Sequence, residues 1–147
     1  MTVLELQIYI SELLSDLRPL TKEGQQIVYT HEGEAKIMMD KKSLRHILFN
    51  LLSNAIKFSP ENGKISISSQ LDKKVLLLSI KDDGIGISDV DQKHLFERFF
   101  RGRNAGNIQG TGLGLHIVSK YVEFLNGTID FSSEENKGTT FTIVIPR

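Results

Sequence analysis

The sequence contains no cysteine and no apolar run long enough to span a membrane. Without cysteine the chain forms neither disulfides nor thiolate metal sites, which suits a reducing compartment. The longest strongly apolar run, residues 75–80, is far shorter than the roughly 20 residues that a membrane helix needs. Glu5 and Gln7 interrupt any apolar stretch at the N-terminus, so we expect no signal peptide there. These absences favour a cytoplasmic location.

Net charge is also lacking, because 18 Lys and Arg residues balance 18 Asp and Glu residues. No overall field therefore favours nucleic acid or an acidic membrane, and we expect no nucleic-acid partner. The length of 147 residues, with 39% hydrophobic and 24% charged residues, is typical of one soluble globular domain. We take residues 1–147 as that single domain.

Hydrophobic spacing predicts alternating helices and strands. We expect helices over residues 3–17, 40–58, 92–100 and 113–125, and strands over residues 25–29, 35–39, 65–71, 75–80, 128–132 and 139–145. Residues 31–33 are expected to form the turn between the first two strands, and residues 101–110 a polar, glycine-rich loop. This order predicts an α/β two-layer sandwich, a mixed sheet covered on one face by helices.

The helix expected over residues 40–58 carries an unusual polar stripe. His46, Asn50, Asn54 and Lys57 are spaced by four, four and three residues, so they share one face. Amide oxygens are hard ligands and an ammonium group attracts phosphate, so the stripe suits a phosphate-bound Mg²⁺. A solvated helix face is the alternative interpretation.

Two glycine-rich motifs add to this signal. Residues 82–87, Asp-Asp-Gly-Ile-Gly-Ile, follow an expected strand, and Asp82 there could accept a hydrogen bond from the exocyclic amine of adenine. Residues 110–115, Gly-Thr-Gly-Leu-Gly-Leu, open an expected helix, where exposed N–H groups form an anion cradle. The spacing matches neither the Rossmann fingerprint nor a Walker-type loop. Each motif alone could be a plain turn or a flexible helix start.

Together the motifs resemble the ATPase superfamily of DNA gyrase, the ninety-kilodalton heat-shock chaperone, MutL and the histidine kinases. Residues 48–59 resemble the N box, residues 82–86 the first glycine box, residues 95–101 the F box of histidine kinases, residues 110–115 the second glycine box, and residues 138–141 the closing glycine motif. The resemblance covers nearly the whole chain and implies a Bergerat-type ATP-binding fold. It implies the ATP-binding catalytic domain of a sensor histidine kinase.

The resemblance also assigns roles, with ATP and Mg²⁺ as the implied cofactors. Asn50 and Asn54 would hold Mg²⁺, Lys57 would pair with phosphate, and Asp82 would bind the adenine amine. Arg101 would face the γ-phosphate, and residues 102–109 would form a lid over the nucleotide. The full implied nucleotide-binding set is Asn50, Asn54, Lys57, Phe58, Asp82, Gly84, Gly86, Ile87, Arg101, Gly110, Thr111, Gly112, Leu113, Gly114, Leu115 and Thr139, with Asn50, Lys57 and Arg101 as catalytic residues.

Asn50 favours phosphotransfer over hydrolysis. Hydrolytic members of the superfamily carry at this position a glutamate that activates water, and an amide cannot take that proton. A clamp-type ATPase, a degenerate binding module and a serine kinase of the anti-sigma type are the alternatives. An F box and intact motifs argue against them.

None of the four histidines, His31, His46, His94 and His116, lies in the His-Glu/Asp-x-x-x-Pro-like context of a phosphoacceptor. We therefore expect the acceptor on a separate dimerisation domain of the same kinase, with a response regulator as an indirect partner. The isolated domain is expected to be a monomer, and the full protein could be a membrane-bound sensor with this part in the cytoplasm.

Overall fold

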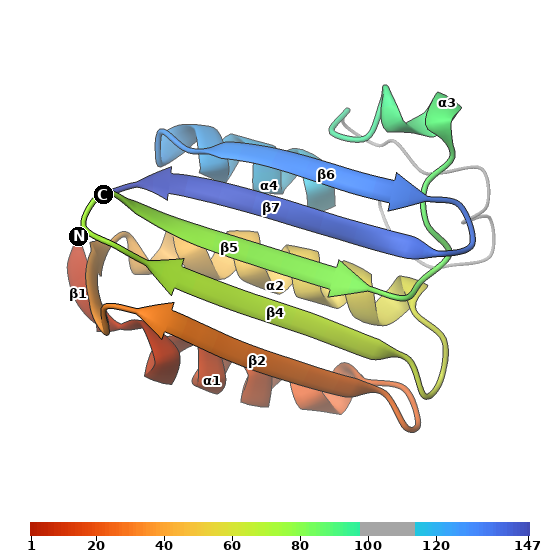
Figure 1. Cartoon of the computed structure of the whole chain (residues 1–147), viewed down its shortest axis with the longest axis horizontal. Coiled ribbons are helices and arrows are strands. Elements are labelled where there is room, and N and C mark those ends of the chain that lie inside the picture. Colours follow the sequence, from red (N-terminus) through yellow and green to blue (C-terminus); the bar gives the residue numbers. More distant parts are fainter. Residues whose placement is uncertain (98–113) are drawn as a thin grey trace.

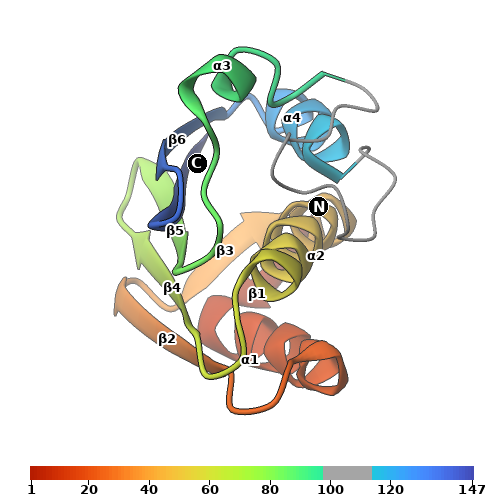
Figure 2. The same ribbon diagram turned by 90° about the vertical axis from the view of Figure 1, so that its right-hand side faces the viewer.

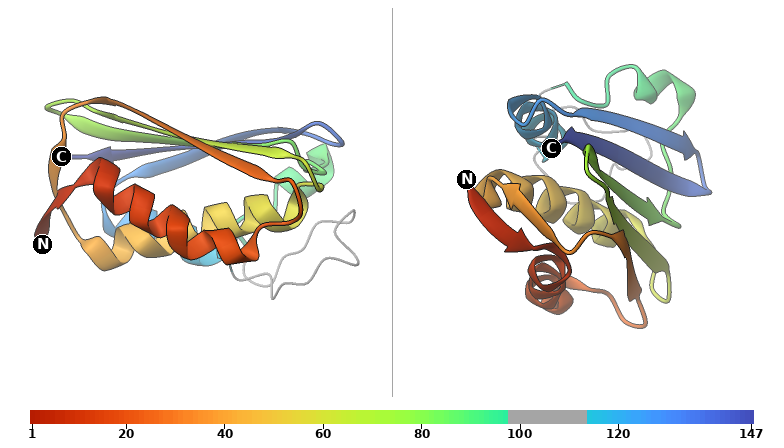
Figure 3. Two further views of the ribbon diagram at one scale, coloured as in Figure 1. Left: turned by 90° about the horizontal axis from the view of Figure 1, so that it is seen from below. Right: turned by 60° about the vertical axis from the view of Figure 1, so that its left-hand side comes forward.

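The computed structural model describes residues 1–97 and 114–147. A five-stranded mixed sheet, in the order β2-β4-β5-β7-β6, has helices on one face only, and β1 and β3 form a separate two-stranded ribbon (Figures 1 and 3). The strands are β1 (Thr2–Glu5), β2 (Gln26–Gly33), β3 (Lys36–Met39), β4 (Lys64–Leu71), β5 (Val75–Asp82), β6 (Thr128–Glu134) and β7 (Gly138–Pro146). The helices are α1 (Leu6–Leu17), the 3-10 turn η1 (Arg18–Leu20), α2 (Lys41–Phe58), α3 (Asp89–Gln92) and α4 (Gly114–Phe124).

The sheet is mixed because β2 pairs with β4 in parallel, whereas β4–β5, β5–β7 and β7–β6 are antiparallel. Alternate residues of the central strands point to the helical layer, so Ile67, Leu78 and Ile143 are almost fully buried. Helix α2 meets them with an apolar face that includes Leu48 and Leu52. The predicted two-layer sandwich is therefore confirmed. No helix in the described ranges is long and apolar enough to cross a membrane.

Three predicted elements were wrong in detail. The first helix begins at Leu6 rather than residue 3, because Val3 belongs to β1 and pairs with Met38 of β3. Residues 31–33 are not a turn but the end of β2, and β2 does not pair with the strand that follows it. Both differences arise from long-range strand pairing, which local hydrophobic spacing does not reveal.

The third difference concerns the helix expected over residues 92–100. Helix α3 lies earlier, at Asp89–Gln92, and residues 93–96 form turns. The Ser88 hydroxyl accepts a hydrogen bond from the Asp91 N–H at 3.3 Å, so the helix begins directly after this cap. The remaining part of that prediction, and the loop expected over residues 101–110, extend outside the described residues.

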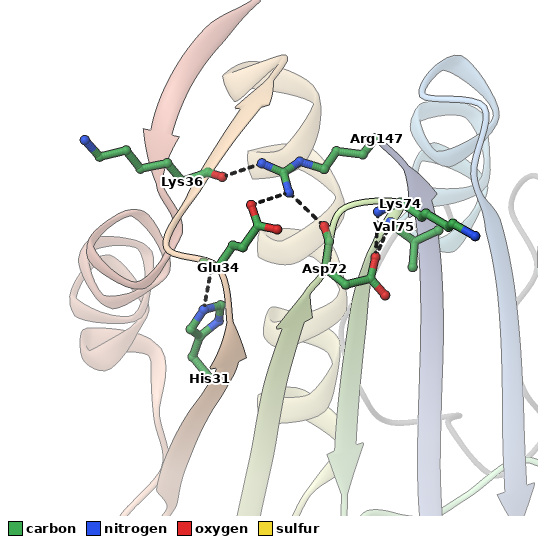
Figure 4. Close-up of polar contacts among 7 residues, drawn as sticks. All are labelled: His31, Glu34, Lys36, Asp72, Lys74, Val75 and Arg147. Carbon is green, nitrogen blue, oxygen red and sulfur yellow. Dashed lines mark hydrogen bonds and ion pairs between the residues drawn. The ribbon is translucent and has the colours of Figure 1, made fainter.

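Arg147 ties together the end of the sheet at which both termini lie (Figures 1 and 4). Its guanidinium donates to the Glu34 carboxylate at 2.8 Å, to the Asp72 carbonyl at 2.7 Å and to the Lys36 carbonyl at 3.0 Å. The Asp72 carboxylate in turn accepts the backbone N–H groups of Lys74 and Val75, which lowers its pKa. This cluster joins the end of β7 to the β4–β5 turn and to the connection between β2 and β3.

We predict that Arg147→Met lowers the free energy of unfolding by roughly 1 kcal/mol, because two backbone carbonyls and a carboxylate lose a charged donor. Thermal unfolding should show a midpoint about 2–4 °C lower. Lys137→Met is the matched control, since it removes only an ion pair with Glu134 whose side chains are 71% and 69% exposed. An Arg147 variant no less stable than the control would contradict this account.

Candidate functional site

The polar stripe of α2 faces the start of α4, which lies beside it (Figure 2). A Cβ atom built at Gly114 would lie 3.5 Å from Asn54 Nδ2, 3.6 Å from Asn50 Oδ1 and 3.7 Å from Asn54 Oδ1. Both amide oxygens therefore lie close to one point at the helix start. These are ordinary van der Waals distances, so the start of α4 lies in direct contact range of the polar stripe.

A hydrogen bond within α2 orients Asn50. Its Nδ2 donates to the His46 carbonyl at 2.6 Å, so the nitrogen points along the helix and Oδ1 faces α4. Asn50 and Asn54 are half-buried, whereas Lys57 at the end of the stripe is exposed. Two hard amide oxygens beside a helix start fit a divalent cation that takes its other ligands from phosphate and water.

The His46 side chain holds the two helices together. Its ring stacks on Tyr121 of α4 with centroids 4.5 Å apart and planes 7° apart. The structure thus places the ring of His46, the first residue of the predicted stripe, in an interhelical stack. The other histidines are also engaged: His31 with Ser69 at 2.6 Å, His94 with Glu97 at 2.8 Å, and His116 with the Phe96 carbonyl at 3.3 Å.

Asp82 ends β5 as a buried carboxyl group with only 8% of its surface exposed. Burial raises the pKa of Asp82 to about 6, although backbone N–H groups of Gly84 and Thr139 partly offset the shift. The Gly84 N–H donates to Oδ1 at 2.8 Å. Burying a carboxylate is unfavourable because it loses its hydration, so its presence here suits recognition of a hydrogen-bond donor on a ligand.

The segment after β5 packs directly against the end of α2. A Cβ at Gly84 would lie 2.5 Å from the Phe58 carbonyl, which also accepts the Ile85 N–H at 3.1 Å. Gly86 has a φ of 69°, a left-handed conformation that disfavours side chains. The glycines of this motif therefore let the chain pass close to Phe58 and bring the Asp82 segment and the polar stripe into one region.

A hydroxyl network supports this segment from β6 and β7. Ser133 Oγ donates to the Gly138 carbonyl at 3.0 Å and accepts the Ile87 N–H at 2.8 Å. Its bond to Thr139 Oγ1, at 2.8 Å, therefore takes the Thr139 hydrogen and leaves the Thr139 oxygen as an acceptor. Gln92 donates to the carbonyls of Ile87 and Ser133 at 2.9 and 3.1 Å. Sequence reasoning missed Ser133 and Gln92, because lone polar residues on a strand or a short helix carry no pattern.

A hollow of about 520 Å³ adjoins this network, and its lining includes Asp82, Ser133, Gly138 and Thr139. It includes no residue of α2, and its lining also contains Lys81, Ser132 and Thr140. These residues alternate along their strands with the inward-facing ones, so the hollow opens on the face of the sheet away from the helices.

The expected residues that the structure describes gather on four neighbouring elements. They are Asn50, Asn54, Lys57 and Phe58 on α2, Asp82 on β5 with Gly84, Gly86 and Ile87 after it, Gly114 and Leu115 on α4, and Thr139 on β7. Arg101, Gly110, Thr111, Gly112, Leu113 and the predicted lid of residues 102–109 lie outside the described residues. The described set brings amide oxygens, a helix start and a buried carboxyl group together.

Comparison with known proteins identifies the family of this chain. Residues 39–147 match the family described as histidine kinase-, DNA gyrase B-, and HSP90-like ATPase. The chain is 36% identical over 141 residues to sensor histidine kinase WalK of Bacillus subtilis (strain 168), covering 91% of this chain and 23% of that protein. It is 35% identical over 149 residues to sensor-like histidine kinase SenX3 of Mycobacterium tuberculosis (strain ATCC 25618 / H37Rv), covering 99% of this chain and 36% of that protein.

Solved structures agree with the sequence relatives. The mycobacterial sensor histidine kinase MprB superposes with a TM-score of 0.86 and 28% identity, covering 99% of this chain and 97% of that one. The nucleotide-free catalytic domain of histidine kinase ThkA gives a TM-score of 0.79 and 27% identity, covering 99% and 96%. The chain spans a quarter or less of WalK and about a third of SenX3. By sequence and by fold, the chain belongs to the family of histidine kinase-, DNA gyrase B- and HSP90-like ATPases, as a catalytic domain of the histidine kinase type.

Proposed function

We propose that this domain binds Mg·ATP and positions the γ-phosphate for transfer to a histidine on a separate dimerisation domain of the same kinase. The observation that carries the proposal is the convergence of the Asn50 and Asn54 amide oxygens on the start of α4. Kinase names among the relatives support it. In this proposal a response regulator receives the phosphate later, and residues 1–147 act as one cytoplasmic, monomeric domain.

The phosphate side of the proposed site consists of α2 and α4. Asn50 and Asn54 would hold Mg²⁺, which supplies positive charge against the phosphate oxygens when it is bound. Lys57 adds an exposed ammonium group on the same face, and the N–H groups at the start of α4 would attract an anion. Phosphoryl transfer depends mainly on positioning and charge stabilisation, and these groups provide both without themselves forming a covalent bond to the phosphate. In this proposal Arg101 faces the γ-phosphate, and residues 102–109 form a lid over the nucleotide.

The base side of the proposed site consists of Asp82 and its supports. An ionised Asp82 accepts from the exocyclic amine of adenine, and the Thr139 oxygen remains available to a bridging water. Phe58, Ile87 and the two glycines between them shape the surroundings. Guanine presents a carbonyl at the same place, so two acceptors would face each other.

Asn50 separates phosphotransfer from hydrolysis within this family. A glutamate at this position would activate water, and an amide at neutral pH takes no proton. The described geometry supports a role in phosphotransfer, because the Asn50 amide nitrogen donates to the His46 carbonyl and only the amide oxygen faces the site.

We predict that the chain binds ATP at least about tenfold more tightly than GTP, because only adenine presents Asp82 with a hydrogen-bond donor, its exocyclic amine. Isothermal titration with both nucleotides in the presence of Mg²⁺ measures the ratio. Asp82→Asn should weaken ATP binding strongly, whereas Asp83→Asn, at the exposed neighbour, should leave it unchanged. Equal affinity for ATP and GTP would rule out the role of Asp82.

The raised pKa of Asp82 also predicts how stability depends on pH. Its pKa is about 6 in the folded chain, against an ordinary value of 3.8 for an aspartate side chain. Between those values the folded chain binds more protons than the unfolded one, so this group makes the free energy of unfolding fall as pH rises, with no further change above about pH 6. The pKa values of Asp40 and Asp72 are lowered, so their effects fall below this window.

Asp82→Asn should remove this dependence and be relatively more stable than the parent chain near pH 7, by roughly 1–2 kcal/mol. Urea unfolding of both proteins at about pH 4.5 and about pH 7 gives the comparison. If both lose or gain the same free energy between the two conditions, Asp82 is not a buried group with a raised pKa.

The purified chain should not phosphorylate itself, because none of its histidines lies in an acceptor context. Incubated with γ-labelled ATP, it should label only a separately added dimerisation domain of the same kinase, with alkali-stable and acid-labile phosphate. Asn54→Ala should reduce this labelling by about tenfold or more, through loss of a metal ligand. Stoichiometric phosphohistidine on the chain itself would contradict the proposal.

A further inference from the structure

Helix α2 ends without any local cap. Its last residue, Phe58, is followed by Ser59 in an extended conformation, with φ −91° and ψ 148°, and then by Pro60. Neither a left-handed glycine nor a continuing turn therefore receives the last carbonyls of the helix. Only the Ala55 carbonyl finds a nearby partner, the Ser59 N–H at 3.1 Å. The carbonyls of Ile56, Lys57 and Phe58 need donors from elsewhere.

Lys22 and Gln25, which precede β2, supply most of these donors. The Lys22 ammonium group donates to the Lys57 carbonyl at 2.8 Å and to the Ser59 carbonyl at 2.7 Å. The Gln25 side-chain amide donates to the Ile56 and Ser59 carbonyls, both at 3.1 Å. The Ile85 N–H donates to the Phe58 carbonyl, so each of the three carbonyls at the helix end has a donor. The charge of Lys22 also matches the negative end of the helix dipole.

The geometry of residues 22–25 holds both side chains in place. The Gln25 N–H donates to the Lys22 carbonyl at 3.1 Å, and Gly24 has a φ of 74°, as a type II turn requires at its third position. The Lys22 N–H donates to Gln25 Oε1 at 2.8 Å, so the amide nitrogen of Gln25 points at the helix end. A side chain at Gly24 would collide with Asn62. We name residues 22–25 the capping turn.

We propose that Lys22 and Gln25 are positioning residues for the nucleotide, acting through the last turn of α2. The inference rests on the proposed function, in which Lys57 and Phe58 contact phosphate and adenosine. The side chains of the capping turn donate to backbone carbonyls in the last turn of α2. These two side chains hold the backbone of Lys57 and Phe58 against the segment after Asp82.

A purely structural cap would lower the unfolding temperature but leave the affinity for Mg·ATP unchanged wherever the protein is fully folded. A positioning role changes the affinity under those same conditions. We expect Lys22→Met to weaken Mg·ATP binding by about two- to fivefold at 25 °C, the factor that corresponds to a lost cation at a helix end. Lys22→Arg, whose guanidinium can still donate to two carbonyls, should restore most of it.

The test is calorimetric titration of Mg·ATP into the parent chain, Lys22→Met, Lys22→Arg and Gln25→Leu, with thermal unfolding of each. Lys73→Met is the matched control, because Lys73 is an exposed lysine in the β4–β5 turn, at the opposite end of the sheet from the end of α2 (Figure 1). Amide exchange at Ser59 and Ile85 should accelerate in Lys22→Met and return to the parent rate in Lys22→Arg.

If the parent binds Mg·ATP and Lys22→Met and Gln25→Leu bind it equally well, the positioning role is wrong and the proposed function stands. If the parent chain does not bind Mg·ATP, the proposed function is wrong and the positioning role fails with it. Should Lys22→Met not fold, Gln25→Leu gives the same decision.

Discussion

The approach of α4 to α2 at Gly114 is the contact on which the rest of the site depends. There the start of α4 comes within ordinary contact distance of the side-chain amides of Asn50 and Asn54. The stack of His46 on Tyr121 keeps the two helices at that separation. Because the helix start and the amide oxygens face the same space, a phosphate drawn to the N–H groups would also meet a cation held by the amides.

At Asp82, a feature that suits ligand binding lowers the stability of the fold. Burial raises the pKa of its carboxyl group to about 6, so near neutral pH the folded chain carries a poorly solvated charge. The backbone of Gly84 and Thr139 and the hydroxyl network around Ser133 reduce that cost without removing it. A residue chosen only for folding at this place would be neutral, so its acidity indicates a ligand that donates to it.

Local sequence patterns predicted the parts of the molecule that depend on local geometry. The four-, four- and three-residue spacing placed the stripe of α2 on one face, because helix periodicity alone decides that. The ribbon of β1 and β3 and the parallel pairing of β2 with β4 were missed, since both join segments far apart in the sequence. Lys22 and Gln25 were missed for a related reason: their partners are backbone carbonyls, which no sequence motif marks.

The central claim is that Asn50 and Asn54 lie at the metal of a bound nucleotide. Mn²⁺ replaces Mg²⁺ as a paramagnetic probe, and it broadens nuclear resonance signals of groups close to it. Titration with Mn·ATP should broaden the side-chain amide signals of Asn50 and Asn54 first and leave that of Asn126, at the far end of α4, sharp. Broadening that spares Asn50 and Asn54 while affecting other asparagines would contradict the account.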